Sequence, residues 1–428
     1  MNENAAKKIY ETGICIRNPS IYDQYDSLKE TEWWSFDKLS ELQAKNAEQF
    51  FNFVFNNSRF YRDIFRKFGF RVGGDFCFDD LIKLPELNKA LLVENKDSVK
   101  IDIKDERMRL AETSGTSGEG LEFLRNERWD SLNRATMMRS YDWYGVNLWS
   151  RNGYLWGFNT SYRQALKIRA LDFIQNRFRL FNYSESEIIE FCEKLKGAEF
   201  LSGYSSMIFE VAKRANSLGI SKLPLKMVKG TSEMILDSYH DECYEAFGAK
   251  IVSEYGAAES GIIAFECPSG GLHVNMENLI IETNEDNEVL VTNLASRSFP
   301  IIRYNLGDVI EFDDSKCSCG RNHPLIGSVI GRRGGKVLGI ENEYPALTFY
   351  YVFKNLALEE DVLLNYKVIQ KERGSVDIFI EGARDKRVCE LVYRQLHRYF
   401  SDDISFELKF VRQFQLEQKK RQYFESKL

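Results

Sequence analysis

Hydroxyl and glycine residues gather in one short segment of the chain, Thr113-Ser114-Gly115-Thr116-Ser117-Gly118. Glycine lets the backbone close around an oxyanion, and the amides and hydroxyls can donate hydrogen bonds to it. We interpret this segment as a loop that could hold the phosphates of a nucleotide. It is not a Walker loop, because no Gly-Lys-Ser/Thr follows at the required spacing. A Thr/Ser/Gly cluster is also typical of an ordinary turn, so the interpretation depends on the segments that follow.

Four further segments stand downstream of apolar runs, in a fixed order. They are Gly230-Thr231-Ser232-Glu233, Ser253-Glu254-Tyr255-Gly256-Ala257-Ala258-Glu259, Pro300–Asp308, which we expect to precede a short strand, and Ile330-Gly331-Arg332. Loops at the carboxyl ends of strands are where open α/β sheets bind ligands. Tyr255 could stack on a base, Glu259 could bind a magnesium ion, and Asp308 could accept hydrogen bonds from ribose hydroxyls.

Cysteine spacing suggests a metal site. Cys267 and His273 are separated by five residues, and Cys317 and Cys319 by one. Three thiolates and one imidazole suit a tetrahedral structural zinc ion. The alternative is a set of free buried thiols beside a surface histidine. The remaining cysteines have no ligand spacing and are predicted to be packing residues: Cys15, Cys77, Cys192, Cys243 and Cys389.

Composition narrows the class of protein. The chain has 428 residues, 43% of them hydrophobic, which is enough for two or three domains with large cores. A net charge of −6 gives no reason to expect nucleic acid as a partner. No apolar run is long enough to span a membrane and the N-terminus lacks a signal core, so we expect a cytoplasmic location. No G-x-S-x-G motif supports a serine hydrolase.

The elements that must position these residues follow from periodicity. A long amphipathic helix is predicted over residues 35–69, with Asn56-Asn57-Ser58 as a place where it could be interrupted. From about 100 to 260, apolar strands (Gly153–Phe158, Ala198–Leu201, Lys226–Lys229, Lys250–Ser253) alternate with helices at 185–195, 204–217 and 237–247, as in an α/β layer structure. Asn278–Thr283 and Glu288–Asn293 are predicted to form a hairpin. After the linker Gly331–Lys336, strands near 363–370, 375–380 and 404–411 and a helix at 384–400 indicate a small α+β domain.

Taken together, these motifs resemble those of the adenylate-forming enzymes, in the branch of phenylacetate–CoA ligase and CapK-like proteins. The loop 113–118 is similar to the phosphate-binding loop of that family, Tyr255–Glu259 to its Tyr-Gly-x-x-Glu motif, and Arg303–Asp308 to its Arg-Tyr-x-x-Gly-Asp motif. Cys319-Gly320-Arg321 with Ile330-Gly331-Arg332 resembles its passage into the hinge. The segments 57–62 and 84–89 are similar to ones common in the CapK-like group. The resemblance covers essentially the whole chain.

The resemblance implies a large α/β N-terminal domain with layered sheets and helices, residues 1–332, and a small mobile α+β C-terminal domain, residues 333–428. It implies an enzyme in which a substrate carboxylate attacks the α-phosphate of MgATP, giving an acyl-adenylate and pyrophosphate. A thiol or amine acceptor would then take the acyl group. The ATP site would comprise residues 113–118, Ser232, Glu233, Glu254, Tyr255, Gly256, Asp308 and Arg332, with magnesium bound by Glu259.

The family also carries a catalytic lysine near the C-terminus, in a Gly-Lys pattern. Here Gln418 replaces the glycine, and Lys419 is favoured over Lys420 as the counterpart. A solvated basic tail is the alternative. Two other departures are Gly120, where proline is usual, and Arg333-Gly334, where an acidic hinge pair is usual.

Several alternatives stay open at this stage. The acceptor could be CoA, an amino sugar or a carrier, with surface polysaccharide assembly as one setting. A phenylacetate-type aryl-CoA ligase is one alternative, and a non-catalytic nucleotide-binding protein is another. The acyl pocket is expected near Tyr154–Phe158 and Gly203–Met207. Neither the acid nor the oligomeric state follows from the sequence.

Overall fold

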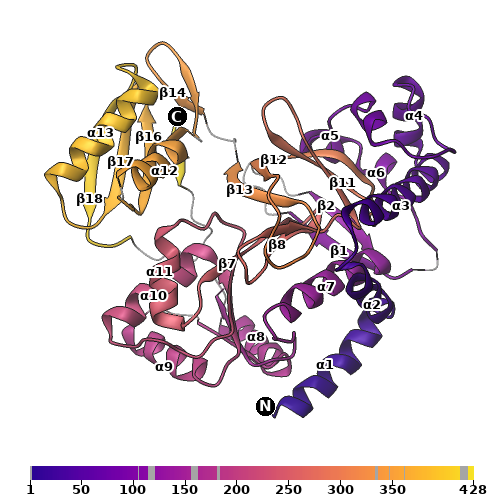
Figure 1. The fold of residues 1–428 in the computed structure, drawn as a ribbon, viewed down its shortest axis with the longest axis horizontal. Coiled ribbons are helices and arrows are strands. Elements are labelled where there is room, and N and C mark those ends of the chain that lie inside the picture. The colour runs from indigo at the N-terminus through magenta and orange to yellow at the C-terminus, as the bar shows by residue number, and fades with distance from the viewer. Residues whose placement is uncertain are drawn as a thin grey trace.

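A mixed β-sheet forms the centre of the larger part of the molecule (Figure 1). The computed structural model describes residues 2–104, 106–113, 121–155, 162–180, 184–332, 336–346, 348–360, 362–414 and 423–428. Within these, the sheet has eleven strands. In spatial order they are β10 (Leu279–Thr283), β11 (Glu288–Asn293), β12 (Ile301–Asp313), β13 (Leu325–Arg332), β9 (Leu272–Val274), β8 (Gly261–Glu266), β7 (Ile251–Ala257), β6 (Met227–Thr231), β5 (Phe200–Tyr204), β3 (Asn152–Leu155) and β4 (Arg177–Arg179).

The sheet has a parallel half and an antiparallel half. Strands β4, β3, β5, β6 and β7 pair in parallel, whereas β8 to β13 pair antiparallel. Strand β13 pairs with two neighbours over different lengths. Most of β13 pairs with β12, but β13 pairs with β9 only through Leu325–His273 and Ile326–Leu272. We call this short β13–β9 ladder the seam of the sheet.

Helices cover both faces of the parallel half. On one face, α9 (Glu185–Leu195), α10 (Ser205–Ser217) and α11 (Ser238–Phe247) enclose a core that includes Leu201, Val228 and Ile251. On the other, α7 (Glu127–Asp142) contributes Tyr141 to a core with Phe200. Apolar residues on successive strand positions therefore serve opposite faces, as expected for a doubly covered sheet. The predicted layered α/β architecture is confirmed.

The N-terminal helices pack mainly against the antiparallel half and α7. They are α1 (Glu3–Arg17), α2 (Ile21–Thr31), α3 (Phe36–Asn57), α4 (Arg59–Lys67), the 3-10 helix η1 (Phe78–Lys83), α5 (Lys89–Glu94) and α6 (Lys96–Val99). Helix α8 (Tyr162–Ile174) lies instead against β4, at the outer edge of the parallel half. The helical segment predicted over 35–69 is two helices, divided at the possible interruption Asn56-Asn57-Ser58, because Ser58 has an extended backbone that ends α3. The Ser58 hydroxyl accepts a hydrogen bond from the Tyr61 amide (3.4 Å) and so caps α4.

A second sheet belongs to the smaller C-terminal domain. Its strands are β18 (Ser405–Val411), β17 (Ser375–Glu381), β16 (Tyr366–Glu372) and β19 (Phe424–Ser426), in that order, and α12 (Thr348–Glu360) and α13 (Lys386–Phe400) pack on it. Two short pairs complete the strands: β14 (Lys336–Leu338) with β15 (Glu343–Pro345), and β1 (Met108–Glu112) with β2 (Glu122–Asn126). The predicted small α+β unit is therefore confirmed.

Polar contacts join the C-terminal domain to α10 and α11. Lys213 forms an ion pair with Glu381, and the Gln413 amide donates to Glu210 (3.3 Å). The hydroxyls of Tyr239 and Tyr423 lie 2.8 Å apart. The small domain is thus docked on the helices that cover the parallel half (Figure 1).

Two segments that we predicted outside strands lie inside them. Residues Pro300–Asp308 do not precede a strand, since all but Pro300 belong to β12, in which Ile301, Tyr304 and Asn305 pair with β11. Ile330-Gly331-Arg332 ends β13 rather than opening a linker. No helix in the described part of the chain combines the length and hydrophobicity needed to cross a bilayer.

Candidate active site and Cys/His cluster

Strand curvature brings two of the predicted nucleotide-binding residues into contact. The Tyr255 hydroxyl on β7 donates a hydrogen bond to the Asp308 carboxylate on β12 (3.1 Å). These strands are four ladder steps apart, which would be ~19 Å in a flat sheet with strands ~4.8 Å apart. The bulges at which β12 shifts register against both neighbours bend the sheet and close this distance. The site is therefore a product of sheet curvature.

Glu259 lies beside the same strands. Its carboxylate accepts a hydrogen bond from the Tyr304 hydroxyl (3.0 Å), and the residue is only 6% exposed. The Asn293 amide donates to the backbone carbonyls of Glu259 (3.3 Å) and Ser260 (3.0 Å), which fixes the turn between β7 and β8. Two predicted motifs, Tyr255–Glu259 and Arg303–Asp308, thus interlock through two tyrosine–carboxylate hydrogen bonds.

Gly256 has no room for a side chain. A Cβ atom there would lie 2.4 Å from the Gly261 carbonyl oxygen, at the bulge where β7 shifts register against β8. The glycine of the Tyr-Gly-x-x-Glu motif is therefore required by close backbone approach between these strands.

Glu254 is held by a buried lysine that the sequence analysis missed. Lys229 on β6 donates to Glu254 on β7 at 2.7 Å, and their side chains are 7% and 10% exposed. Burial alone would lower the pKa of Lys229, but the charge of Glu254 and the adjacent Tyr141 raise it above its ordinary value. A lone lysine inside the apolar run Met227–Val228 was the available signal, because a charge in a buried strand needs a partner.

Hydrogen bonds join the two ends of the predicted phosphate loop. The Thr113 amide donates to the Leu121 carbonyl (3.0 Å), and the Leu121 amide donates to the Thr113 hydroxyl (2.9 Å). Residues 114–118 themselves lie outside the described residues. Thr113 is buried, and its hydroxyl holds the two ends of the loop together through the bond with Leu121.

The strand end after β6 carries Ser232 and Glu233. Ser232 has a positive φ of 66°, a conformation that costs energy for a residue with a Cβ atom. The Glu233 carboxylate accepts a hydrogen bond from the Ser206 amide (2.8 Å), in the first turn of α10. Glu233 therefore complements the positive end of that helix.

Of the remaining predicted residues, the structure places the backbone of Arg332 but describes neither candidate lysine. Arg332 stands opposite Asp308 in the β12–β13 register. Lys419 and Lys420 lie outside the described residues, as does most of the segment expected at the acyl pocket after Leu155.

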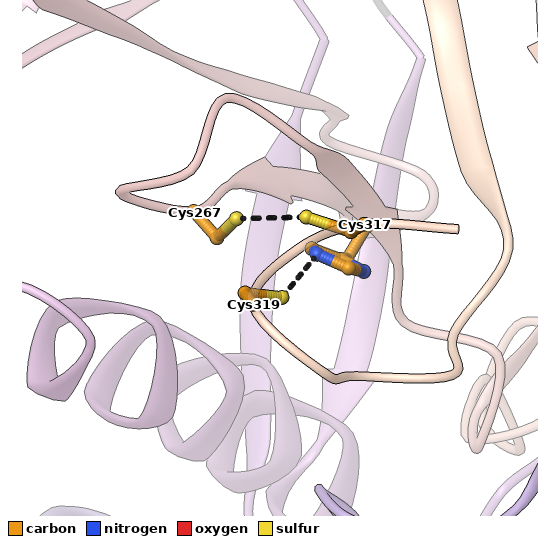
Figure 2. Close-up of side chains that lie close together, drawn as sticks. Cys267, Cys317 and Cys319 are labelled. Carbon is orange, nitrogen blue, oxygen red and sulfur yellow. Dashed lines mark hydrogen bonds between the residues drawn. The ribbon is translucent and has the colours of Figure 1, made fainter. Parts of the chain in front are cut away.

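The predicted metal ligands meet in one place (Figure 2). Atoms of Cys267, His273, Cys317 and Cys319 that could bind a metal all lie within 4.8 Å of one another. The Cys267 and Cys317 sulfurs are 3.6 Å apart, and the Cys319 sulfur is 3.2 Å from His273 Nε2. A tetrahedral zinc site with ordinary bond lengths has edges of ~3.8 Å between sulfurs and ~3.6 Å from sulfur to nitrogen. The donor set therefore fits zinc in both chemistry and spacing.

Local backbone turns hold the four side chains. Cys267 follows β8 and its amide donates to Gly271 (2.8 Å), while the Gly320 amide donates to Cys317 (3.2 Å) in the connection from β12 to β13. Burial lowers the pKa of His273 to about 4, and the electrostatic interaction with nearby His323 contributes. The imidazole is consequently neutral near pH 7, the form that binds metals. His273 itself sits in the seam.

A buried charge network stands beside this cluster. Arg139 donates to Glu277 (2.5 Å), His323 lies 2.9 Å from the same carboxylate oxygen, and all three side chains are at most 3% exposed. Burial alone would raise the pKa of Glu277, but Arg139 and His323 hold it well below its ordinary value. The sequence analysis missed this network, because partners about 140 residues apart leave no local pattern.

The other cysteines divide by environment. Cys192 and Cys243 are buried, as predicted for packing residues. Cys15 and Cys77 are exposed, so that prediction was wrong for them. Cys15 lies on the exposed face of α1, and Cys77 directly precedes η1.

No family model matches the chain. In sequence it is 21% identical over 428 aligned residues to protein CapK of Staphylococcus aureus, covering 91% of this chain and 88% of that protein. It is 22% identical over 401 residues to phenylacetate-coenzyme A ligase of Thermus thermophilus, covering 86% of each.

Solved structures give the fold. The structure of 2-hydroxyisobutyryl-CoA ligase in the postadenylation state, in complex with R3-HIB-AMP, matches 92% of this chain and 91% of that one with a TM-score of 0.71 at 13% identity. The same enzyme in the thioesterification state matches with a TM-score of 0.58 at 16% identity, covering 93% and 91%. The resemblance expected from the motifs is confirmed: this chain is related in sequence to CapK and phenylacetate-coenzyme A ligase, and it has the fold of the adenylate-forming ligases.

Proposed function

We propose that the protein is an ATP-dependent ligase that activates a carboxylic acid as its acyl-adenylate and passes the acyl group to a thiol or amine. The observation that carries the proposal is the interlock of two motifs, Tyr255 with Asp308 and Tyr304 with Glu259. This arrangement gathers an aromatic ring and two carboxylates from distant segments, on a fold used by ligases whose structures contain acyl-AMP.

The first half-reaction joins the acid to the nucleotide. A carboxylate oxygen attacks the α-phosphorus of ATP, a new P–O bond forms, and the bond to the β-phosphate breaks to release pyrophosphate. Asp308 would accept hydrogen bonds from the ribose, Tyr255 and Glu254 would border the adenine, and residues 114–118 would donate to the phosphates. Glu259 would hold magnesium, which neutralises phosphate charge when bound.

The second half-reaction transfers the acyl group. A thiol or amine attacks the acyl carbon, the acyl–phosphate bond breaks, and AMP leaves while the nucleophile loses its proton. A thiol such as that of coenzyme A is supported by the names of the phenylacetate and 2-hydroxyisobutyrate ligases. An amine such as an amino sugar, in surface polysaccharide assembly, is the second class of acceptor that we propose.

We also propose that Cys267, His273, Cys317 and Cys319 bind a structural zinc ion. All four donors come from protein, which leaves no open position for substrate. The ion would tie the connection after β8 to the connection between β12 and β13.

The test is pyrophosphate release with MgATP and a panel of aryl, fatty, hydroxy and amino acids, without acceptor. We expect release with one class of acid, and AMP release to rise when coenzyme A or an amino sugar is added. Protein that binds ATP but releases no pyrophosphate with any acid would instead support the non-catalytic alternative.

The lysine prediction needs its own pair of variants. Lys419→Ala is expected to slow adenylation more than acyl transfer from preformed acyl-AMP, because a cation near the α-phosphate stabilises charge in the first transition state. Lys420→Ala is the matched control. Loss of adenylation only in Lys420→Ala would show that the register is wrong.

A further inference from the structure

A polar cavity lies outside the proposed active site, between α2, α3 and α7. Its volume is about 240 Å³, and it is also lined by the connections that precede β10 and follow β11. Figure 1 shows these three helices on the side of the molecule away from the C-terminal domain. Pockets for drug-sized ligands occupy ~300–1,000 Å³, so this α2–α3–α7 cavity suits a smaller molecule, about the size of a monosaccharide.

The lining is rich in groups that bind hydroxyls. Gln24, Ser27 and Gln49 contribute side chains that make no hydrogen bond within the described part of the chain, and Asn46 and Asn278 contribute two more amides. Only part of the Asn46 amide is used, through its donation to the Glu277 carbonyl (3.0 Å). Planar amides with both donors and acceptors match the vicinal hydroxyls of a sugar.

Positive charge dominates the same lining. Arg128 and Arg297 line the cavity, and neither guanidinium forms an ion pair with a described residue. The acidic group in the lining, Glu277, is already neutralised by buried Arg139 at 2.5 Å. Glu106, nearby, is engaged by the Arg128 amide at 3.1 Å. The Arg297 guanidinium lies 5.2 Å from the centroid of the Phe53 ring, and Arg128 is exposed to solvent. An anionic ligand could therefore pair with both guanidinium groups.

Two buried polar atoms lack a partner here. Asn278 Nδ2 and Glu277 Oε2 are buried without a hydrogen bond, and both residues line the cavity. Glu277 is 2% exposed. Burying such groups unpaired costs free energy, which water or a ligand would recover. Asn278 also lines an adjoining cavity of about 20 Å³, roughly one water molecule, that reaches Ser260 beside Glu259.

We propose that the α2–α3–α7 cavity binds a small hydroxylated anion, a sugar phosphate or a sugar acid. Arg128 and Arg297 bind the anionic group, and the amides of Gln24, Asn46 and Gln49 bind hydroxyls. The site is separate from the acid and ATP sites, and it stands whether or not the chain is a ligase.

Isothermal titration of the full chain tests the proposal, with glucose 6-phosphate and glucuronate as probes and glucose and inorganic phosphate as comparators. We expect one of the two sugar anions to bind, and each comparator to bind at least tenfold more weakly. Arg297→Gln should weaken binding roughly tenfold or more, since a charged hydrogen bond is lost. Asn46→Phe should abolish it by filling the cavity. Arg59→Gln, at a side chain 89% exposed on α4, is the matched control and should bind normally.

Three results would overturn the proposal. Binding of neither sugar anion would do so, as would phosphate alone or glucose alone binding as tightly as they do. Unchanged affinity in folded Arg297→Gln and Asn46→Phe would place the ligand elsewhere. Thermal melts show which variants are folded. If Asn46→Phe is not folded, Ser27→Gln, at an exposed position of α2, narrows the same cavity and replaces it in the test.

Discussion

Replacing Lys229 by methionine tests the most buried ion pair of the candidate nucleotide site. The change keeps much of the aliphatic length but removes the ammonium that faces Glu254 at 2.7 Å. A carboxylate at 10% exposure is then left without its partner. Breaking a buried pair in this way costs about 3–5 kcal/mol. If a large domain of roughly 330 residues unfolds as a unit, its unfolding entropy of ~0.7 kcal/mol/K converts this into a fall in Tm of about 4–7 °C.

The chain offers a matched control for this prediction. Lys226, next to β6, pairs with Glu199 at 3.1 Å, but its side chain is 51% exposed. Surface pairs of this kind contribute about 0–1 kcal/mol, so Lys226→Met should lower Tm by less than about 2 °C. Both variants are measured by calorimetry, with the double variant Lys229→Met/Glu254→Gln alongside.

The double variant separates two causes of a lower Tm. It should recover most of the loss, because the uncompensated charge is gone. Equal, small falls in Lys229→Met and Lys226→Met would refute the reasoning that burial makes this pair essential. A double variant no more stable than Lys229→Met would show that lost packing, rather than the orphaned Glu254 charge, explains the effect.

Three other outcomes follow from the site. Asp308→Ala should raise the KM for ATP in pyrophosphate release roughly 10- to 100-fold, as charged hydrogen bonds to the ribose are lost, and an unchanged KM would exclude that role. Burial raises the pKa of Glu266 from 4.5 to about 7. In the unfolded protein Glu266 ionises at lower pH than in the folded protein, so the free energy of unfolding falls as pH rises from 4.5 to 7, by roughly 3 kcal/mol at most. Glu266→Gln should reduce this pH dependence in urea titrations at pH 5 and 8. The same pH dependence in both proteins would contradict the prediction. Cys317→Ser should lower zinc content by mass spectrometry and abolish the fall in Tm that a chelator causes in the unaltered protein; equal zinc content would rule out this ligand.

The sequence indicated the chemistry of the site better than its construction. Tyr255, Glu259 and Asp308 could be singled out because motif spacing is local. The contacts of Tyr255 with Asp308 and of Glu259 with Tyr304 depend on the bulges of β12, which come from register shifts between strands rather than from residue type. For the same reason residues 300–308 are predicted to precede a strand, since polar Arg303 and Asn305 interrupt the apolar pattern of a segment that is nonetheless paired with β11.

Long-range polar pairs escaped the sequence analysis altogether. The partner of Lys229 is 25 residues away, and Arg139 and Glu277 are 138 residues apart. The four metal ligands were an exception, because cysteine pairs carry a signal at short spacing, although the meeting of the two halves depends on the β13–β9 ladder.

The seam sets how the large sheet can come apart. Tyr255 and Glu259 belong to the side with the parallel strands, whereas Tyr304 and Asp308 belong to the antiparallel side, so both tyrosine–carboxylate bonds bridge the two sides. Between β13 and β9 only two residue pairs and the bond from the Val274 amide to the Pro324 carbonyl (2.9 Å) hold the ladder. Local opening begins where ladders are short, and here it would separate the two halves of the site. One apolar core, with Ile263 and Val274 on one side of the seam and Tyr304 and Ile326 on the other, spans this line and opposes such opening. The Cys/His cluster spans that same line, because Cys267 and His273 lie on one side of the seam and Cys317 and Cys319 belong to the connection before β13. A metal bound there would therefore hold the two sides of the candidate site together.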